Sequence, residues 1–548
     1  MESAMNRRNF LKAAIASGAV IAAGGALAGC SPNGGSTGGS GEAEQVVGTA
    51  PVSFSEETDV LILGTGIAGM SAAMDPVEAG HKVMLVDKLD RVGGESFIAC
   101  GVMNVVGSKM QKDAGIEGDP EQMWEKFLPV LEKKGETDDM DYKHNVYVYQ
   151  TEWANRVAAD YGSVFQPITD YMNTGAPTSM LLPGNGIGDM QAVLTPLQKG
   201  LEQKGATYKL NLRATNFIVD GEGAPIGVRF NDEKNNKTVD IRAKKIIVAT
   251  GGFLGNVDMM REKFGTFVNP LGNVLSVGEG IDMVQAAGGQ LSTQWGIAGN
   301  EFTGSNQKAD GLYDRKSAAF TIGIYGTLLV NNQGRRFSNE GKFANLPLAL
   351  GGAISLVGGK YYAVVDQAYV DGLNSGKDAW TLCGADEVNW RTGMMTLKDK
   401  PLENVQGSID DAVSAGWAFK ADTIEALAQA IDAPELVETL DEYNGYCADG
   451  NDEQFYKPAC FLQPVTTGPF YAFQYEPSAW VTIGGIRTND RLQAIDGEGV
   501  AIPGLYVAGA DNGTLMSAPY CDYEGYSLMC AYCGGRLAGQ YAVETIDA

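Results

Sequence analysis

Three glycines close to residue 65 have the spacing of a phosphate-binding turn. Gly64, Gly66 and Gly69 follow the apolar run 60–63 in the pattern G-x-G-x-x-G. In such a turn the first glycine allows a tight bend, the second lets the backbone approach a pyrophosphate, and the third lets the following helix pack on the sheet. A second apolar run ends at Asp87, whose carboxylate could bind ribose hydroxyls. Strand, helix, strand and acid follow in this order, which predicts a dinucleotide-binding fold.

Three further segments carry related motifs. Segments 87–102, 245–253 and 502–511 contain DKLDRVGGES, KIIVATGGF and IPGLYVAGAD. With the glycine turn they resemble, in the same order, the motifs of the FAD-dependent oxidoreductase 2 superfamily, which includes fumarate reductases, urocanate reductases and 3-ketosteroid dehydrogenases. The resemblance covers about residues 58–548 and implies FAD as the cofactor. The residues that it assigns to FAD binding are Gly64, Gly66, Ala68, Gly69, Asp87, Lys88, Gly93, Gly94, Glu95, Ser96, Cys100, Gly101, Thr250, Gly251, Gly509, Asp511, Ser527 and Leu528.

Details of the motifs bear on how FAD is held and on where its electrons come from. Asp511 stands where the family usually has glutamate. Covalent attachment in complex-bound fumarate reductases uses a histidine near the glycine-rich segment, and residues 95–98 contain none, so we expect non-covalent FAD. No second G-x-G-x-x-G with a following strand and acid occurs in the sequence. A separate NAD(P)H domain is therefore not expected, and electrons must come from, or go to, another partner.

The resemblance also implies the fold. We expect an α/β protein with a Rossmann-like (glutathione-reductase-type) FAD-binding domain interrupted by an α+β capping domain. The FAD-binding domain would comprise residues 58–295 and 457–548, and the capping (substrate) domain residues 296–456, with the substrate between the two lobes. Local patterns predict helices at 70–79, 423–430 and 525–546, a helical insertion at 123–171, and strands at 211–220, 226–231, 239–241, 327–331 and 361–366.

Four motif-anchored sites indicate which substrate the pocket could take. In the dicarboxylate reducers of the family they carry the arginine, glutamate and histidine side chains that bind and protonate the substrate. Here they fall on Ala344, on the segment 319–323, on Val481 and on Asp522. No group that would attract a dicarboxylate remains, so we expect that fumarate is not the substrate. The neighbouring rings suit an enone, a cinnamate-like acid or a steroid, although some of them could be ordinary core aromatics; they are Phe320, Tyr325, Phe343, Trp480, Tyr520 and Tyr523.

Reduction of a C=C bond by a flavin also requires a proton donor. The chain has two histidines, and neither matches a catalytic motif. Tyrosines do this work in ketosteroid dehydrogenases, so Tyr520 and Tyr523 are the first candidates for the acid or base, and Lys342 is the second. A tyrosine has an ordinary pKa near ~10 and donates at neutral pH only within a tuned network. The backbone N–H of Gly525 could polarise a substrate carbonyl, as its counterpart does in the ketosteroid enzymes.

The N-terminus has the pattern of an export signal. Arg7 and Arg8 precede F-L-K and an apolar stretch at 13–29, which resembles a bacterial twin-arginine signal. The sequence Leu-Ala-Gly-Cys ending at Cys30 resembles a lipobox. We therefore expect a signal at residues 1–30, lipidation of Cys30, a flexible linker at 31–57, and an extracytoplasmic protein that is anchored to the cell membrane. The alternative is cleavage elsewhere, which would release a soluble exported form.

The net charge and the cysteine content limit the classes of partner and of metal site that can be expected. The formal net charge of −26 argues against nucleic acid and anionic lipid, because their phosphates would be repelled. Seven cysteines follow Cys30, an odd number that excludes a complete disulfide framework. Cys521, Cys530 and Cys533 lie close together and could hold a cluster or a redox pair, but packing as small apolar side chains is favoured, and no metal site is predicted.

These features together predict an exported, respiration-linked FAD enzyme that reduces an activated C=C bond. Its electrons would come from a separate quinol, cytochrome or flavoprotein partner. One alternative is the reverse reaction, desaturation of a ketosteroid-like ring. A second alternative is a flavin electron carrier with no alkene chemistry.

Overall fold

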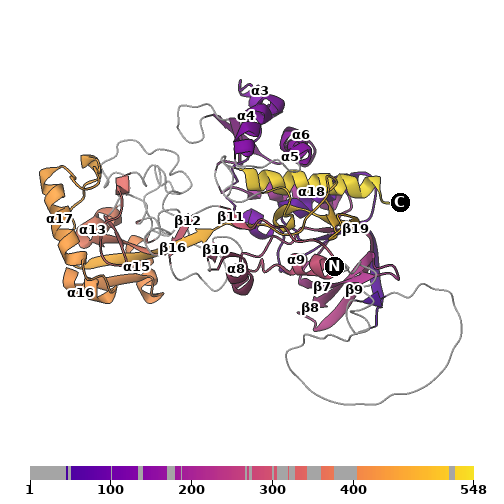
Figure 1. The fold of residues 1–548 in the computed structure, drawn as a ribbon. Helices are drawn as coiled ribbons and strands as arrows, with labels where there is room; N and C mark the ends of the chain where they lie inside the picture. Colours follow the sequence, from indigo (N-terminus) through magenta and orange to yellow (C-terminus); the bar gives the residue numbers. More distant parts are fainter. Residues whose placement is uncertain are drawn as a thin grey trace, which may run out of the picture.

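The chain forms two lobes, each built on its own sheet (Figure 1). The larger lobe contains a nine-stranded sheet and the C-terminal helix, and the smaller lobe contains a six-stranded sheet and the helices at 367–374, 405–414, 424–430 and 436–449. The computed structural model describes residues 45–46, 51–99, 101–133, 140–169, 179–186, 188–265, 268–270, 274–298, 301–304, 319, 322, 328–341, 359–375, 404–516 and 525–547.

The nine-stranded sheet has a parallel centre that begins with the predicted strand, helix and strand. Strand β2 (Phe54–Leu63) pairs in parallel with β3 (Val83–Val86) and with β9 (Lys237–Val248), and β3 pairs in parallel with β6 (Thr207–Lys209). Helix α2 (Ile67–Glu78) connects β2 to β3, so the glycine turn lies at the carboxyl end of the central strand. The remaining strands of the sheet are β1 (Gln45–Val46), β7 (Leu212–Val219), β8 (Pro225–Asp232), β18 (Gln493–Ile495) and β19 (Ala501–Val507).

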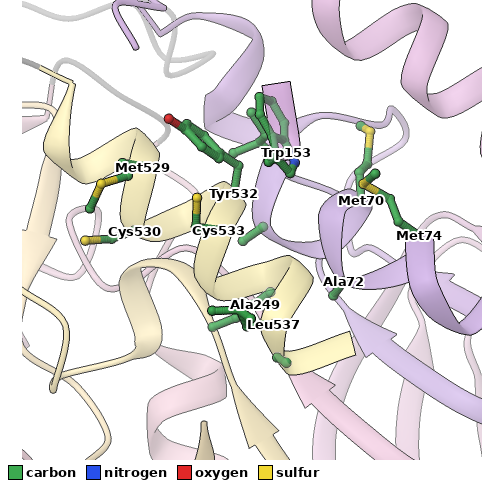
Figure 2. Close-up of a cluster of buried hydrophobic side chains, with 14 of the residues drawn as sticks. Met70, Ala72, Met74, Trp153, Ala249, Met529, Cys530, Tyr532, Cys533 and Leu537 are labelled. Carbon is green, nitrogen blue, oxygen red and sulfur yellow. The ribbon is translucent and has the colours of Figure 1, made fainter. Parts of the chain in front are cut away.

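Helix α18 (Tyr526–Glu544) packs along α2, so two segments far apart in the sequence lie side by side. Gly535 and Gly539 allow this close approach, because a Cβ at either position would overlap the backbone of α2. Figure 2 shows the core between these helices, in which the ring of Trp153 stacks on that of Tyr532 at a centroid distance of 4.0 Å. The Trp153 indole N–H donates to the hydroxyl of Ser71, 2.9 Å away. The predicted C-terminal helix is therefore confirmed.

The region expected to be helical as far as residue 171 is shorter than predicted. It contains α3 (Lys109–Asp113), α4 (Pro120–Lys133), α5 (Met140–Val148) and α6 (Gln150–Tyr161). Helix α6 ends because Gly162 adopts a left-handed conformation with φ 79°. Beyond it, β4 (Phe165–Thr169) forms an antiparallel pair with β5 (Ser179–Pro183), so the prediction of helix there is wrong.

The six-stranded sheet is built around β16 (Phe470–Ala479). This strand pairs with β14 (Tyr361–Asp366), which pairs in turn with β13 (Leu328–Asn331). The second sheet therefore extends to residue 479, beyond position 457, where the sequence analysis expected the return to the FAD-binding domain. The other strands are β10 (Asn269–Pro270), β12 (Glu301–Gly304) and β15 (Ala418–Ala421), and the helices are α13 (Gln367–Asn374), α15 (Val405–Ser414), α16 (Ile424–Ala430) and α17 (Leu436–Asp449).

The lobes are joined where β16 ends. After Trp480 the chain enters β17 (Val481–Ile483), which pairs with β11 (Gly296–Ala298) in a two-stranded sheet. The other helices of the larger lobe are α7 (Gln191–Gln203), α8 (Val257–Phe264) and α9 (Glu279–Ala286). Within the described ranges, no helix has both the length and the hydropathy needed to cross a membrane.

Candidate functional site

The glycine turn leaves the N-terminus of α2 open. Gly64 has φ +107°, and a Cβ there would overlap the carbonyl oxygen of Ala249 on the neighbouring strand. Gly66 is the N-cap of α2 and, as a glycine, supplies no side-chain hydrogen bond to the helix. A Cβ on Gly66 would meet only Ser96 Oγ, at 3.4 Å, and the Gly93 oxygen, at 4.0 Å. This cradle in front of a helix N-terminus fits the pyrophosphate of FAD.

The predicted segment 93–96 lies directly against this turn. The Gly93 N–H donates to the carbonyl oxygen of Thr65, 3.1 Å away, and the Ile67 N–H donates to Ser96 Oγ, 2.9 Å away. Gly94 begins a short 3₁₀ helix (Gly94–Phe97), and a Cβ on Gly94 would meet nothing within 4 Å. The structure therefore brings this second group of predicted cofactor residues to the N-terminus of α2.

Asp87 lies at the end of β3 and already has protein partners. Its Oδ2 accepts hydrogen bonds from the N–H and Oγ1 of Thr65, at 2.9 and 2.6 Å, and its Oδ1 accepts one from the Leu89 N–H, at 3.0 Å. A carboxylate offers about four acceptor positions, so it retains capacity for a ribose hydroxyl. The adjacent Lys88 pairs with Glu279 at the start of α9.

Asp511 holds the third motif in place. Its fully buried carboxylate accepts hydrogen bonds from the N–H groups of Thr250, Gly251 and Gly252 and from the Thr250 hydroxyl. Burial raises the pKa of Asp511, and these donors partly offset that effect. The structure shows Asp511 as a positioning residue for the turn 250–252, and direct contact of Asp511 with FAD stays a prediction.

The segment 482–485 packs on the same turn. Thr482 Oγ1 accepts a hydrogen bond from the Phe253 N–H at 3.2 Å. The Ile486 N–H donates to the backbone oxygen of Asp511, 2.8 Å away, and a Cβ on Gly485 would overlap that oxygen. Motifs that are far apart in the sequence therefore meet at the carboxyl ends of β2, β9 and β19.

A second helix N-terminus lies at the far end of the segment that begins at Gly93. Gly525 is the N-cap of α18, has φ +83° and, as a glycine, supplies no side-chain hydrogen bond to the helix. A Cβ on Gly525 would lie 2.7 Å from the Val102 oxygen and 2.9 Å from the Asn104 nitrogen. Residues 93–104 therefore connect the N-termini of α2 and α18. Two positive helix ends along one segment fit an extended dinucleotide, with the pyrophosphate at α2 and the flavin carbonyls at α18.

Asn104 is a further candidate for the site, and the sequence analysis did not single it out. Its side chain is 5% exposed, and its Oδ1 is buried with no hydrogen-bond donor within reach in the described part of the chain. The sequence feature that could have indicated Asn104 is its position as the single polar residue within the apolar run 102–106. Ser527 and Leu528 lie in the first turn of α18, where the resemblance placed them.

The described residues include Trp480 and Ala319 of the predicted substrate pocket. Trp480 is half-buried at the junction of β16 and β17. Its backbone N–H donates to the backbone oxygen of Ala298, 3.0 Å away. Ala319 is fully buried. The candidates that lie outside the described residues are Cys30, Cys100, Phe320, Tyr325, Lys342, Phe343, Tyr520 and Tyr523.

A buried ionic cluster holds the segment 336–340, which precedes Lys342. Arg336 donates to Glu340 at 3.0 and 2.8 Å and to Asp452 at 3.0 and 2.7 Å. Lys457 Nζ lies 3.7 Å from Glu340. Burial opposes the ionisation of Asp452, but hydrogen bonds from Arg336 and from nearby backbone N–H groups outweigh it and lower its pKa to about 2. The sequence did not indicate this cluster, because Asp452 is 116 residues from Arg336.

Cys530 and Cys533 are buried in the core beside Tyr532, as Figure 2 shows, which supports the packing role favoured for them. Burial raises the pKa of the Cys533 thiol well above its ordinary value, which disfavours the thiolate that a metal or redox site needs. Cys521 lies outside the described residues. Among the residues that the structure covers, no group of three or more His, Cys, Asp or Glu side chains could hold a metal ion.

Comparison with known families agrees with this geometry. A family model described as FAD binding domain matches residues 59–520, and the chain therefore belongs to this family. The chain is 28% identical to urocanate reductase of Eggerthella lenta, over 91% of this chain and 77% of the relative. It is 28% identical to vinyl phenol reductase of Lactiplantibacillus plantarum, over 89% of this chain and 96% of the relative.

The fold is also similar to a solved structure, the open conformation of a flavocytochrome c3 fumarate reductase. The TM-score is 0.65 at 23% identity, with 90% of this chain and 79% of the other covered. The family and the relatives establish FAD as the cofactor and the chain as an FAD-dependent oxidoreductase that acts on C=C bonds. They confirm the predicted superfamily, fold class and enzyme class.

Proposed function

We propose that this protein is an exported reductase for an activated C=C bond in an apolar or aromatic small molecule, supplied with electrons by a separate respiratory partner. One observation carries the choice of substrate. Where dicarboxylate reducers have cationic side chains, this chain has Ala344, Val481 and Asp522, and the buried Ala319 occupies a further contact position. A dicarboxylate would find no counter-charge at these positions. The similarity to a reductase whose name specifies a vinyl phenol supports an aromatic alkene.

Each group in the site has an assigned task in this proposal. Bound FAD supplies the hydride that is added to one carbon of the alkene. The neighbouring carbon takes a proton from Tyr520 or Tyr523, with Lys342 as the other candidate donor. The Gly525 N–H, at the positive end of α18, polarises the activating carbonyl of an enone or cinnamate. The rings that line the pocket are Phe320, Tyr325, Phe343 and Trp480.

Anaerobic reoxidation of the reduced enzyme tests the substrate class directly. The flavin absorbance would be followed after mixing with fumarate, urocanate, hydroxycinnamates, vinyl phenols, enones or a 3-ketosteroid. We expect rapid reoxidation by an aromatic alkene or an enone and none by fumarate. Reoxidation by fumarate would overturn the assignment of the substituted positions. No reoxidation by any alkene, together with cycling by artificial dyes, would favour a dehydrogenase or an electron carrier.

Conservative variants test the proton donor. Removal of the acting acid by Tyr520→Phe, Tyr523→Phe or Lys342→Met is expected to slow alkene reduction by about 10²- to 10⁴-fold, because general acid catalysis contributes that much. FAD content should remain unchanged. Tyr541→Phe, which removes a hydroxyl near the other end of α18, is the matched control and should keep the rate. Full activity in all three site variants would exclude these side chains as the donor.

The proposed location has its own test. Replacement of Arg7 and Arg8 by lysine should retain the protein in the cytoplasm, since twin-arginine export depends on that pair. Cys30→Ser should abolish lipid labelling and release the exported protein from the membrane fraction. Membrane attachment that persists in Cys30→Ser would contradict lipidation at this residue and leave export to be judged from the arginine variant alone.

A further inference from the structure

Asn104 carries an acceptor with no partner in the described structure. The side chain is 5% exposed, and its neighbours Val102, Met103, Val105 and Val106 are all buried. No donor among the described residues reaches Asn104 Oδ1, which is itself inaccessible to solvent. An unsatisfied buried acceptor destabilises a protein, and a donor that arrives with a ligand would remove this cost.

The backbone around Asn104 is rigidly held. Met103 and Leu181 exchange two hydrogen bonds of 3.0 Å each in an antiparallel bridge. On the next residue, the Asn104 nitrogen lies 2.9 Å from the position of a Cβ on Gly525. Asn104 is therefore fixed beside the N-terminus of α18, a helix of 19 residues whose N-cap has no side-chain hydrogen bond.

The two features together describe a particular ligand group. A helix N-terminus favours a carbonyl that carries negative charge, and the amide oxygen of the neighbouring Asn104 requires an N–H or O–H donor. The pyrimidine part of the flavin ring offers this pair, because its C2 carbonyl, which gains negative charge on reduction, is next to the N3–H. The alternative donors are the hydroxyls of the ribityl chain and of a substrate.

We propose that Asn104 Oδ1 accepts a hydrogen bond from the flavin N3–H and that Asn104 is a positioning residue for the ring. The contact fixes the orientation of the ring against α18, where the helix N-terminus stabilises the charge of the reduced form. It uses FAD alone and is independent of which alkene the enzyme reduces.

The test removes the donor and the acceptor in turn. Apoprotein of the wild type and of Asn104→Leu would be titrated with FAD and with 3-methyl-FAD, which lacks the N3–H. We expect the wild type to bind FAD about tenfold more tightly than the methylated form, the upper range for one hydrogen bond, and Asn104→Leu to bind both nearly equally. The apoprotein of Asn104→Leu should be at least as stable as the wild type, because the unsatisfied acceptor is gone.

Tyr532→Phe is the matched control. The Tyr532 hydroxyl is also buried with no partner in the described ranges, but it lies in the core against Trp153. This variant should retain the wild-type preference for FAD. If Asn104→Leu does not fold, Asn104→Ser provides the same comparison with a shorter side chain.

Two results would overturn the proposal. One is an unchanged preference for FAD over 3-methyl-FAD in the Asn104 variants. The other is an unchanged affinity for both flavins with an altered KM for the alkene, which would assign the acceptor to the substrate. A wild-type enzyme that fails to reduce any alkene would contradict the proposed function but would leave the flavin titrations interpretable.

Discussion

Arg336 shows how much of the cap depends on a single side chain. Its side chain is 1% exposed. The side chains of Glu340 and Asp452, which both accept hydrogen bonds from it, are 0% exposed. Lys457, whose side chain is also 0% exposed, lies 3.7 Å from Glu340 and supplies a second cation. Two cations and two anions therefore compensate one another, which offsets the desolvation of each. The cluster fixes residues 334–341, and the next residue is the candidate donor Lys342.

Arg336→Gln should lower the free energy of unfolding by about 3–5 kcal/mol at pH 7, because it leaves buried carboxylates without their partner. Arg335→Gln is the matched control. Arg335 is the neighbouring arginine, but its pair with Glu435 is exposed, so the expected cost is at most about 1 kcal/mol. Denaturant unfolding of both variants measures the difference, and similar costs would mean that the cluster does not stabilise the cap.

The cost of Arg336→Gln should also depend on pH. The pKa of Asp452 is lowered to about 2, below its ordinary value of 3.8. Its ionised form therefore contributes stability that is fully present above about pH 4 and is lost as the pH falls toward 2. The gap between wild type and Arg336→Gln should narrow over that interval. A gap that is constant from pH 7 to pH 3 would contradict the assignment.

At the scale of elements, the turn before α2 distinguishes glycines needed for folding from glycines needed for the cofactor. Gly64→Ala should prevent folding, because φ is +107° and the Cβ would overlap Ala249. Gly66→Ala should fold, since its Cβ meets only Ser96 and Gly93 at 3.4 Å or more. The added methyl occupies the cradle, so FAD affinity should fall by at least about tenfold.

Gly80→Ala is the control for these glycine variants. Gly80 has φ +82° just beyond α2, and its Cβ would meet nothing within 4 Å. This substitution should cost about 1 kcal/mol of stability through backbone strain and leave FAD binding unchanged. Thermal unfolding of the apoproteins and flavin titration separate the two effects. Unaltered FAD affinity in Gly66→Ala would place the pyrophosphate elsewhere.

The elements that sequence could predict are those with a local cause. The strand at 83–86, the turn at Gly64 and helix α18 follow from apolar runs, glycine spacing and helical periodicity, and the structure has them. The role of Asp511 was not predictable, because its donors are about 260 residues away. Membership of β16 in the second sheet depends in the same way on pairing with β14, more than 100 residues earlier. Long-range pairing leaves no periodic signal in the segment that takes part in it.

At the scale of the whole molecule, charge governs the encounter with an electron donor. The chain has 67 acidic and 41 basic residues, which gives the formal net charge of −26. A protein of this charge attracts cationic reactants and repels anionic ones over about one Debye length, ~30 Å at 0.01 M salt and ~8 Å at 0.15 M. The sequence has no second G-x-G-x-x-G followed by a strand and an acid, so we infer that the electron donor is a separate partner and that it meets this protein with a positively charged surface.

This inference predicts the sign of a salt effect on flavin reduction. The rate constant for reduction by the methyl viologen radical cation should fall by about threefold or more between 0.01 and 0.15 M ionic strength, because salt screens the attraction. A viologen with sulfonate side chains, whose reduced form is anionic, is the matched donor, and its rate constant should rise over the same interval. Stopped-flow measurements of flavin bleaching give both values. If both responses are reversed, the charge near the flavin differs in sign from the net charge, and the partner would then be expected to present an acidic surface. Responses in the same direction would contradict electrostatic control of the encounter.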